Sequence, residues 1–149
     1  MVVSTQNHGV IDEMFRSIRA NLKFVLKNPN EKVMLVTSSI AGEGKSFFSI
    51  NLALSLAMLN KRVALVGLDI RKPMLAKYLG VKNAPGVTNF LSDKSMKASD
   101  IVVTSPQNAN LDVYVGGTIP PNPAELLNDN RLDELFEVLT LVQTNKIDK

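Results

Sequence analysis

The sequence contains no cysteine and no tryptophan, and its single histidine is His8. Without cysteine there is neither a disulfide framework nor a thiolate metal site, and one histidine cannot build an imidazole cluster. Any metal ion must therefore be held by oxygen. Long apolar runs are absent too, since none approaches the roughly 20 residues that a membrane span requires. The chain starts without the basic-then-apolar pattern of a signal peptide. These absences predict a soluble, intracellular chain.

An excess of charge is also missing. The net charge is only +3, and basic residues are scattered except for one cluster near the start of the chain. Nucleic-acid binding usually needs a dense basic face with aromatic platforms, so this class of function is not expected. Apolar residues make up 45% and charged residues 21% of the 149 residues. This composition predicts a globular protein, with residues 1–149 forming a single domain.

The apolar pattern of the first half predicts an α/β arrangement. Apolar residues at steps of three and four predict an amphipathic helix over residues 10–27. A short apolar run over 32–37 predicts a strand, the almost wholly apolar stretch 46–59 a buried helix, and a second run over 62–69 another strand. Strand, crossover helix and parallel strand form the unit from which parallel sheets are built.

The second half has weaker patterns. A short helix is expected near 75–79, and residues 84–110, rich in Asn, Ser and Pro, predict short helices and turns. Weak alternation over 111–115 predicts a third strand. Asn122 followed by Pro123 is typical of a helix start, with a capping residue before proline at the first helical position. A last amphipathic helix is expected around Leu132, Leu135, Phe136 and Leu139.

The most informative stretch is SSIAGEGKS, residues 38–46. Between a strand and a helix, Gly42 and Gly44 would let the backbone approach a phosphate, and the amides at the helix start would point at the anion. Lys45 would neutralise the β- and γ-phosphate oxygens, and the Ser46 hydroxyl would ligate Mg²⁺. The alternative is an ordinary glycine-rich turn before a buried helix. The expected nucleotide-binding residues are Gly42, Glu43, Gly44, Lys45, Ser46 and Phe47.

The opening glycine of the usual phosphate-loop pattern is replaced by Ser39. If that position needs a left-handed backbone, a residue other than glycine costs on the order of 1 to 2 kcal/mol there. The sequence therefore predicts a strained but usable loop.

Asp69 stands at the carboxyl end of the second predicted strand, where open parallel sheets bind their ligands. Its carboxylate could reach the Mg²⁺ shell or take a proton from an attacking hydroxyl. The alternative is a capping aspartate with Arg71 as a surface partner.

The first predicted helix carries a basic face. A solvated face is the usual explanation of such a pattern. However, Phe24 lies on the same side, which indicates a partner surface. The basic residues opposite the apolar side are Arg16, Arg19, Lys23 and Lys27, with Glu13 at the border.

Taken together, these features resemble the bacterial tyrosine kinases (BY-kinases) of capsule and exopolysaccharide export, which share an ancestor with the MinD and ParA ATPases. That family often lacks the opening glycine of the loop. Four segments in order carry the resemblance: Glu13-x-x-Arg16-x-x-Arg19; residues 37–46 followed by Asn51-Leu52-Ala53; residues 66–73; and residues 119–127.

The resemblance implies a three-layer P-loop NTPase fold of the MinD/ParA type, a parallel sheet flanked by helices and incomplete at the C-terminus. It implies an ATP-binding domain of a protein-tyrosine autokinase that uses ATP and Mg²⁺, releases ADP and relies on Lys45 and Asp69 for catalysis. It also implies a ring-like homo-oligomer formed through Glu13, Arg16 and Arg19. A membrane-embedded chain-length-determinant protein would be its partner at the inner face of the cell membrane.

The chain departs from the family pattern at several points. Gly67 stands where the first aspartate of Asp-x-Asp-x-Arg belongs, which removes a carboxylate. The apolar strand that should follow the last helix and the tyrosine-rich tail are not in the sequence, so the strand before the loop would become an exposed edge. Tyr78 and Tyr114 are expected to be structural.

Two other functions compete with the kinase. A ParA/MinD-type switch ATPase is one, although Ile40 occupies the position of its signature lysine. A non-catalytic assembly module is the other, favoured by Gly67 and by the missing C-terminal elements.

Overall fold

The computed structural model describes residues 9–81 and 84–147, with the backbone alone for residues 141–147. These residues fall into two compact units. The first contains residues up to 63 together with 106–111, and the second contains 64–105 together with the residues from 112 onward. The expectation of one domain over 1–149 stays a prediction. In the described part of the chain, no helix is long and apolar enough to cross a membrane.

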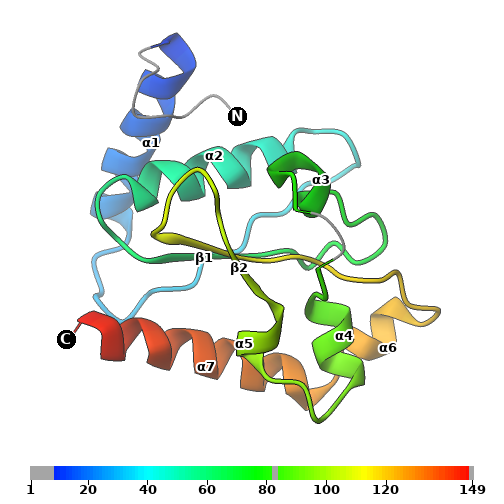
Figure 1. The fold of residues 1–149 in the computed structure, drawn as a ribbon. Helices are drawn as coiled ribbons and strands as arrows, with labels where there is room; N and C mark the ends of the chain where they lie inside the picture. Colours follow the sequence, from blue (N-terminus) through cyan, green and yellow to red (C-terminus); the bar gives the residue numbers. More distant parts are fainter. Residues whose placement is uncertain (1–8, 82–83, 148–149) are drawn as a thin grey trace. The chain divides into compact units, whose positions relative to one another are not determined.

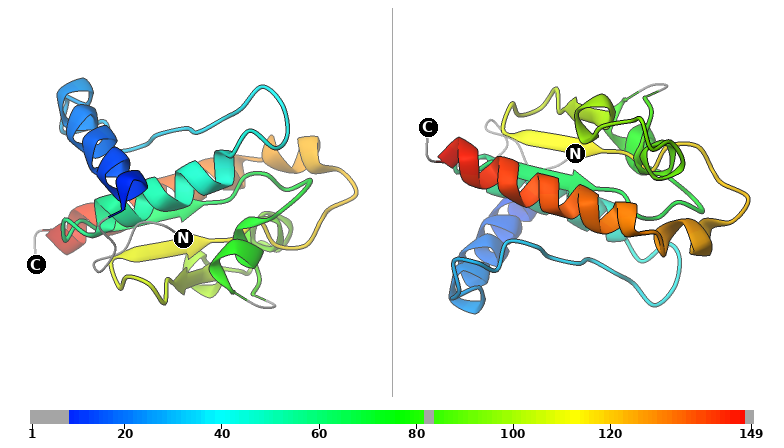
Figure 2. Two further views of the ribbon diagram at one scale, coloured as in Figure 1. Left: turned by 90° about the horizontal axis from the view of Figure 1, so that it is seen from above. Right: turned by 90° about the horizontal axis from the view of Figure 1, so that it is seen from below.

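The first unit contains two helices, α1 (Val10–Val25) and α2 (Lys45–Ala57). Both lie close to the predicted ranges. Figure 2 shows α1 crossing α2, and the two helices are in contact. Because α2 is apolar almost all round, the sequence predicts a buried helix, and the structure agrees. Its buried residues are Ile50, Asn51, Leu52, Ala53, Leu54, Ser55 and Ala57.

The strand predicted over 32–37 is not formed, so that prediction is wrong. Residues 31–38 have no regular secondary structure, and Val33 and Leu35 are 61% and 79% exposed. A strand exists only when a neighbour pairs with its N–H and C=O groups. Within the described residues no strand pairs with this run, so its apolar, β-branched composition is insufficient.

The amphipathic helix predicted over 10–27 is present as α1, but most of its apolar stripe is exposed. Only Asp12 and Phe15 are buried, whereas Ile11 and Met14 of the apolar stripe are 43% and 59% exposed. Two helices that cross touch each other over a short stretch. Most of the stripe therefore extends beyond the contact with α2.

The second unit is built on a three-stranded sheet of β1 (Val63–Val66), β2 (Val102–Thr104) and β3 (Leu111–Tyr114), in the order β1-β3-β2. β2 and β3 are antiparallel. β1 runs parallel to β3, because residue 63 bonds to residue 110 and residue 67 to residue 114. The sheet is therefore mixed, and the prediction of a parallel sheet is wrong in this respect. The sequence missed the short strand β2.

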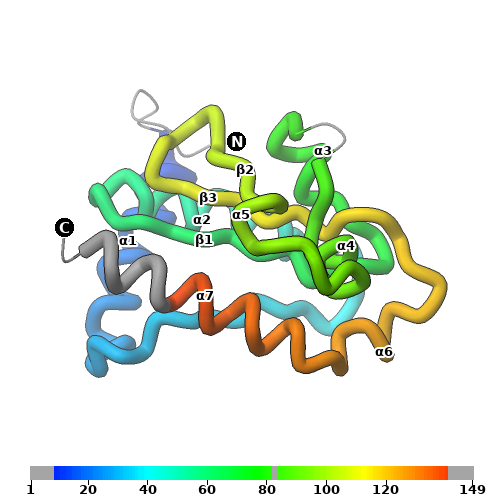
Figure 3. Tube along the Cα trace, turned by 60° about the horizontal axis from the view of Figure 1, so that its bottom comes forward, coloured from blue at the N-terminus to red at the C-terminus, as the bar shows by residue number. Residues whose placement is uncertain are grey.

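Five helices complete the second unit (Figure 1), and the chain can be followed through them in Figure 3. The short helix expected at 75–79 is present and ends at Gly80, whose φ is 69°. The helix starting at Pro123 and the last amphipathic helix are also present. The helices are α3 (Leu75–Leu79), α4 (Val87–Ser92), α5 (Ala98–Ile101), α6 (Pro123–Leu127) and α7 (Asn130–Ile147).

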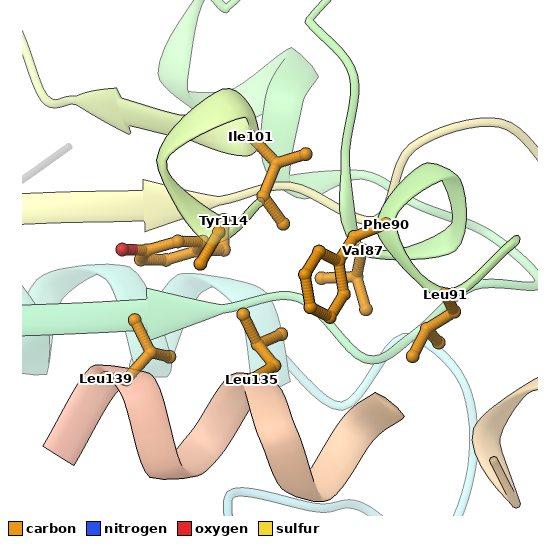
Figure 4. Packing of buried hydrophobic residues seen from close by; sticks show 8 residues of the cluster. Val87, Phe90, Leu91, Ile101, Tyr114, Leu135 and Leu139 are labelled. Atoms are coloured by element: carbon orange, nitrogen blue, oxygen red, sulfur yellow. The ribbon is translucent and has the colours of Figure 1, made fainter. Parts of the chain in front are cut away.

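The core of the second unit lies between α7, the short helices α4 and α5, and the sheet. Figure 4 shows Leu135 and Leu139 projecting from α7 towards Tyr114 and Phe90. These residues are at most 7% exposed. Two of the residues expected on the apolar face of the last helix therefore do form the core. The buried cluster is Val87, Phe90, Leu91, Ala98, Ile101, Tyr114, Leu135 and Leu139.

The start of α4 is bonded to the chain that follows β3. Val87 N–H donates to Val115 O at 2.8 Å, and Thr88 N–H donates to Gly116 O at 3.0 Å. The two backbones approach so closely that a Cβ on Gly86 would collide with backbone atoms of Val115 and Gly117. This contact supplies acceptors for helix N–H groups that would otherwise have none.

Arg131, in the first turn of α7, binds carbonyl groups at the end of α4 and in the turn that follows it. Its guanidinium donates to Phe90 O at 2.9 Å, Asp93 O at 3.1 Å and Met96 O at 2.9 Å. It also lies 4.0 Å from the centre of the Phe90 ring. The Arg131 side chain is 11% exposed. These contacts join two helices that are separated by about forty residues.

Asp93, at the end of α4, has a carboxylate that accepts hydrogen bonds from Ser95 Oγ at 2.6 Å and Ser95 N–H at 2.9 Å. These bonds, with a smaller contribution from Arg131, lower the pKa of Asp93 below 3.8. The ionised Asp93 carboxylate therefore stabilises the folded state fully above its unfolded-state pKa. This contribution is lost as the pH falls through the lower folded-state pKa. We expect the urea unfolding midpoint of Asp93→Asn to fall less steeply than that of the wild type below about pH 4. Near neutrality, the midpoint should depend on pH in the same way in both proteins. An identical acid dependence in wild type and variant would contradict this.

Candidate functional site

The loop before α2 contains two glycines in the left-handed conformation. Gly42 has φ 85° and Gly44 has φ 86°. L-residues with a side chain rarely adopt such angles, which explains glycine at both positions. A Cβ built on either glycine would meet no atom within 4 Å. The backbone of this loop is therefore bordered by open space in which an anion can be accommodated.

Ser39 is not strained. The only described residue other than glycine with a positive φ is Asn60, at 57°. The prediction of a strained cradle is therefore wrong, because this loop does not need a left-handed backbone at the position where the usual pattern has its first glycine.

The Glu43 side chain accepts hydrogen bonds from backbone amides of its own loop. Its Oε2 accepts from Ser39 N–H at 2.9 Å and from Ile40 N–H at 3.4 Å. Ser38 Oγ donates to Ile40 O at 3.1 Å. The amides of the second and third loop residues are thus bound to the Glu43 carboxylate. Glu43 can therefore bind a phosphate through its backbone amide but not through its side chain.

The N-terminus of α2 has the properties of an anion site. Gly44 is its N-cap residue, no side chain caps it, and its first turn contains no acidic residue. Phe48 N–H donates to Gly44 O at 2.9 Å, which closes the first turn. The helix dipole therefore acts on this end with no acidic residue in the first turn, and it is reinforced by the ammonium of Lys45. Ser46 follows directly, with a half-buried side chain.

Phe15 of α1 packs against this first turn. Its ring centre lies 6.2 Å from that of Phe47 and 5.8 Å from that of Phe48. Sequence reasoning missed this contact, although an aromatic residue in the apolar stripe of α1 and an aromatic pair after Lys45-Ser46 were the signal for it. The Phe47 side chain contacts Phe15, so only its backbone amide is a candidate for phosphate binding.

Asp69 belongs to the second unit. It follows β1, is exposed, and its Oδ1 accepts from Lys72 N–H at 3.3 Å. A carboxylate has about four lone-pair sites, so an oxygen that accepts from a backbone amide does not exclude a metal ion or a proton. Ser46 and Asp69, the predicted metal ligands, thus lie in different units. No cluster of three or more potential acidic, His or Cys ligands occurs among the described residues.

Gly67 stands at the position where the related family has the first aspartate of its acidic motif. A Cβ there would lie 3.2 Å from Leu75 Cδ2 and 3.4 Å from Gly116 N. The position is therefore close-packed against a flexible side chain and a backbone amide. A side chain at position 67 would require Leu75 to shift.

The three residues of the predicted oligomerisation motif on α1 have different surroundings. Glu13 is exposed, and Arg16 lies 3.0 Å from Asp12 Oδ2 and 3.8 Å from Glu13 Oε1. Arg19 donates to Ser55 O of α2 at 2.6 Å. Arg19 therefore makes an intramolecular contact and does not lie on a purely solvated face.

Asp12 is a residue that the sequence analysis missed. Its side chain is fully buried, and neither carboxylate oxygen has a hydrogen-bond partner in the described part of the chain. The neighbouring Arg16 guanidinium supplies the compensating charge. The available signal was the spacing of four residues between Asp12 and Arg16, which places the two side chains on the same side of the helix.

The two tyrosines differ as well. Tyr114 is 7% exposed and forms part of the core, as expected for a structural residue. Tyr78 is 56% exposed, so the expectation of a structural role is wrong for this residue.

The left-handed glycines, the uncapped helix and the lysine-serine pair define the class of protein, a P-loop NTPase. Comparisons with known proteins agree. The family model described as ParA, NUBPL iron-transfer P-loop NTPase, matches residues 30–115. Tyrosine-protein kinase YwqD of Bacillus subtilis is 36% identical over 135 residues, which cover 91% of this chain and 56% of the relative.

Solved structures give the same result. The kinase domain of VpsO is 32% identical with a TM-score of 0.70, and the match covers 92% of this chain and 68% of that domain. The chimerical protein CapA2B2 is 31% identical with a TM-score of 0.80, covering 92% of this chain and 59% of that one. The chain therefore belongs to the bacterial tyrosine kinase family, within the ParA-like P-loop NTPases. It spans about half the length of the curated relative YwqD.

Proposed function

We propose that this chain is the ATP-binding part of a protein-tyrosine autokinase that regulates the polymerisation and export of capsule or exopolysaccharide. The observation that supports this most is the loop before α2. Gly42 and Gly44 are left-handed with open space beside them, and α2 has no side-chain cap at its start and no acidic residue in its first turn. The names of the relatives supply the reaction class.

The loop residues divide the work of holding the nucleotide. The backbone amides of residues 42–47 would bind the phosphate oxygens, and the Lys45 ammonium would neutralise the β- and γ-phosphates. Ser46 Oγ and the Asp69 carboxylate would hold Mg²⁺, which when bound neutralises charge on the phosphate oxygens. The donors fit a nucleotide with a hard cation, since both side chains offer oxygen.

The proposed reaction transfers a phosphoryl group to a tyrosine of a neighbouring subunit. The tyrosine hydroxyl oxygen bonds to the γ-phosphorus while the bond to the β,γ-bridging oxygen breaks, and ADP leaves with that electron pair. The phenolic proton goes to Asp69 or to solvent. Catalysis comes mostly from positioning and charge neutralisation, so residues of the loop carry it.

We further propose a ring-like homo-oligomer that involves Glu13, Arg16 and Arg19. The exposed carboxylate of Glu13 supports this, because it is accessible to a neighbouring chain. The partner would be a membrane-embedded chain-length-determinant protein, which would place the kinase at the inner face of the membrane.

Two alternatives have some support. The ParA-like family model supports a nucleotide-switched dimer of the ParA/MinD type, but the signature lysine of that type is replaced by Ile40. Gly67, which removes a carboxylate from the acidic motif, supports an assembly module without catalysis. The first alternative predicts dimerisation on adding Mg-ATP, and the second predicts an oligomer that ignores it.

Replacing Lys45 by methionine tests the proposed function. We expect the variant to lose at least about tenfold in affinity for Mg-ADP and Mg-ATP, equivalent to about 1.4 kcal/mol, because an ammonium that neutralises phosphate charge is removed. Isothermal titration calorimetry on the 149-residue chain measures both dissociation constants.

Lys61→Met is the matched control, since Lys61 is an exposed lysine outside the loop. It should bind like wild type. Absence of binding by the wild-type chain, or equal affinity in wild type and Lys45→Met, would overturn the nucleotide site.

A further inference from the structure

α1 is anchored to α2 at the turn that follows the phosphate loop. Phe15, which is 5% exposed, is the only apolar side chain of α1 that is buried in the described part of the chain. Its ring meets Phe47 and Phe48, the third and fourth residues of α2. Aromatic pairs with ring centres 4.5 to 7 Å apart attract each other beyond the burial of their area, and both pairs lie within this range.

This turn is where the loop becomes a helix. Phe48 N–H closes the first hydrogen-bonded ring of α2 on Gly44 O at 2.9 Å. Lys45 and Ser46 lie inside that ring. The orientation of their backbone amides therefore depends on how the first turn is held, and Phe15 holds it from one side.

A second contact fixes α1 along α2. Arg19, one helical turn after Phe15, donates to Ser55 O at 2.6 Å near the C-terminal end of α2. Carbonyl groups in the last turn of a helix lack intrahelical partners, and a guanidinium is a favourable donor for them. α1 therefore contacts α2 at two places. Phe15 packs on the first turn of α2, next to the loop, and Arg19 binds a carbonyl group near its C-terminal end.

We propose that Phe15 is a positioning residue through which α1 sets the nucleotide affinity of the loop over residues 38–46. This inference rests on the proposed function, because it requires that the loop binds nucleotide. α1 also carries Glu13 and Arg16, so a neighbour that moves α1 moves Phe15. Nucleotide binding at the loop and docking of a neighbouring subunit on α1 are then linked. Each event changes the affinity for the other by the same factor.

The decisive measurement compares the affinity for Mg-ADP of wild type, Phe15→Ala and Phe15→Leu by calorimetry. Loss of both ring contacts should weaken binding about fivefold to tenfold in the alanine variant, given the strength of aromatic pairs. Leucine retains apolar volume without the ring and should give an intermediate dissociation constant. All titrations are made at a temperature where circular dichroism shows the variant folded.

Two controls separate positioning from general destabilisation. Phe24→Ala changes an aromatic residue on the same helix that is 75% exposed, and it should bind like wild type. Ile50→Val weakens the packing of α2 at a residue that is 2% exposed, beyond the first turn. It should lower the unfolding midpoint without the loss of affinity.

The reciprocal effect supplies a second readout. Mg-ADP should slow amide hydrogen exchange in α1 of the wild-type chain and do so less in Phe15→Ala. If the wild-type chain binds Mg-ADP and Phe15→Ala binds it equally, or if Ile50→Val loses as much affinity, the role of Phe15 is overturned while the proposed function stands. If the wild-type chain binds no nucleotide, the proposed function fails first.

Discussion

Replacing Gly86 by alanine is expected to lower the free energy of unfolding by at least about 3 kcal/mol. The new Cβ would fall on the backbone nitrogen of Gly117 and the carbonyl oxygen of Val115. Relief of that clash separates the start of α4 from the chain after β3, which breaks the bonds from Val87 and Thr88 to this segment. Urea unfolding followed by circular dichroism measures the loss.

Gly80→Ala is the matched control. Gly80 has a φ of 69° but open space around it, so alanine there costs only the conformational penalty, on the order of 1 to 2 kcal/mol. Gly86 has a φ of −134°, which any residue can adopt. A smaller loss at Gly86 than at Gly80 would show that the two backbones are not as close as the structure places them.

Arg131→Ala should have the second largest effect, a loss of about 3 kcal/mol in the free energy of unfolding. The substitution leaves the carbonyl groups of Phe90, Asp93 and Met96 without their donor and removes the cation from the Phe90 ring. Each hydrogen bond to a charged group contributes about 1.5 to 3 kcal/mol, and shared contributions do not add. Thermal and urea unfolding provide the measurement.

Arg131→Lys is informative because lysine keeps the positive charge. Its compact ammonium lacks the planar guanidinium that donates to several carbonyl groups at once. It should recover less than half of the loss. Glu134→Gln removes only the exposed partner of Arg131 and should change stability by less than about 0.5 kcal/mol. Full stability in Arg131→Ala would mean that water replaces the guanidinium at no cost.

Local chemistry explains which elements the sequence predicts well. The start of α6 follows from Pro123 after Asn122, and the end of α3 follows from Gly80, because both signals act within one turn of the helix. The glycines of the loop are equally local, since a left-handed backbone favours glycine whatever surrounds it. The candidate phosphate site could therefore be located from sequence alone.

Elements that depend on distant partners were not predictable in this way. β2 is only three residues long and is a strand because Val103 lies opposite Val113. The run over 32–37 has a better strand composition than β2 but no partner among the described residues. Strand formation thus depends on pairing that no local pattern contains.

The surroundings of the site were less predictable than its residues. The bracing of Ser39 by Glu43 and the packing of Phe15 on the first turn of α2 both depend on how the chain returns on itself. Helical periodicity identified an apolar stripe on α1 but could not say which part of it touches α2. The roles of Lys45 and Arg19 both stay predictions, but the contact of Arg19 with Ser55 had no signal in the sequence.

The bond from Arg19 to Ser55 changes how mutants of the motif on α1 must be interpreted. An alanine at Arg19 removes a tie within its own subunit, so an assembly defect in that mutant combines altered tertiary structure with altered quaternary structure. Glu13 has an exposed carboxylate whose closest described cation is Arg16 of the same helix, at 3.8 Å. Charge reversal at Glu13 also removes its own contact with Arg16, so its effect on assembly is identified by rescue with a compensating reversal on a second subunit.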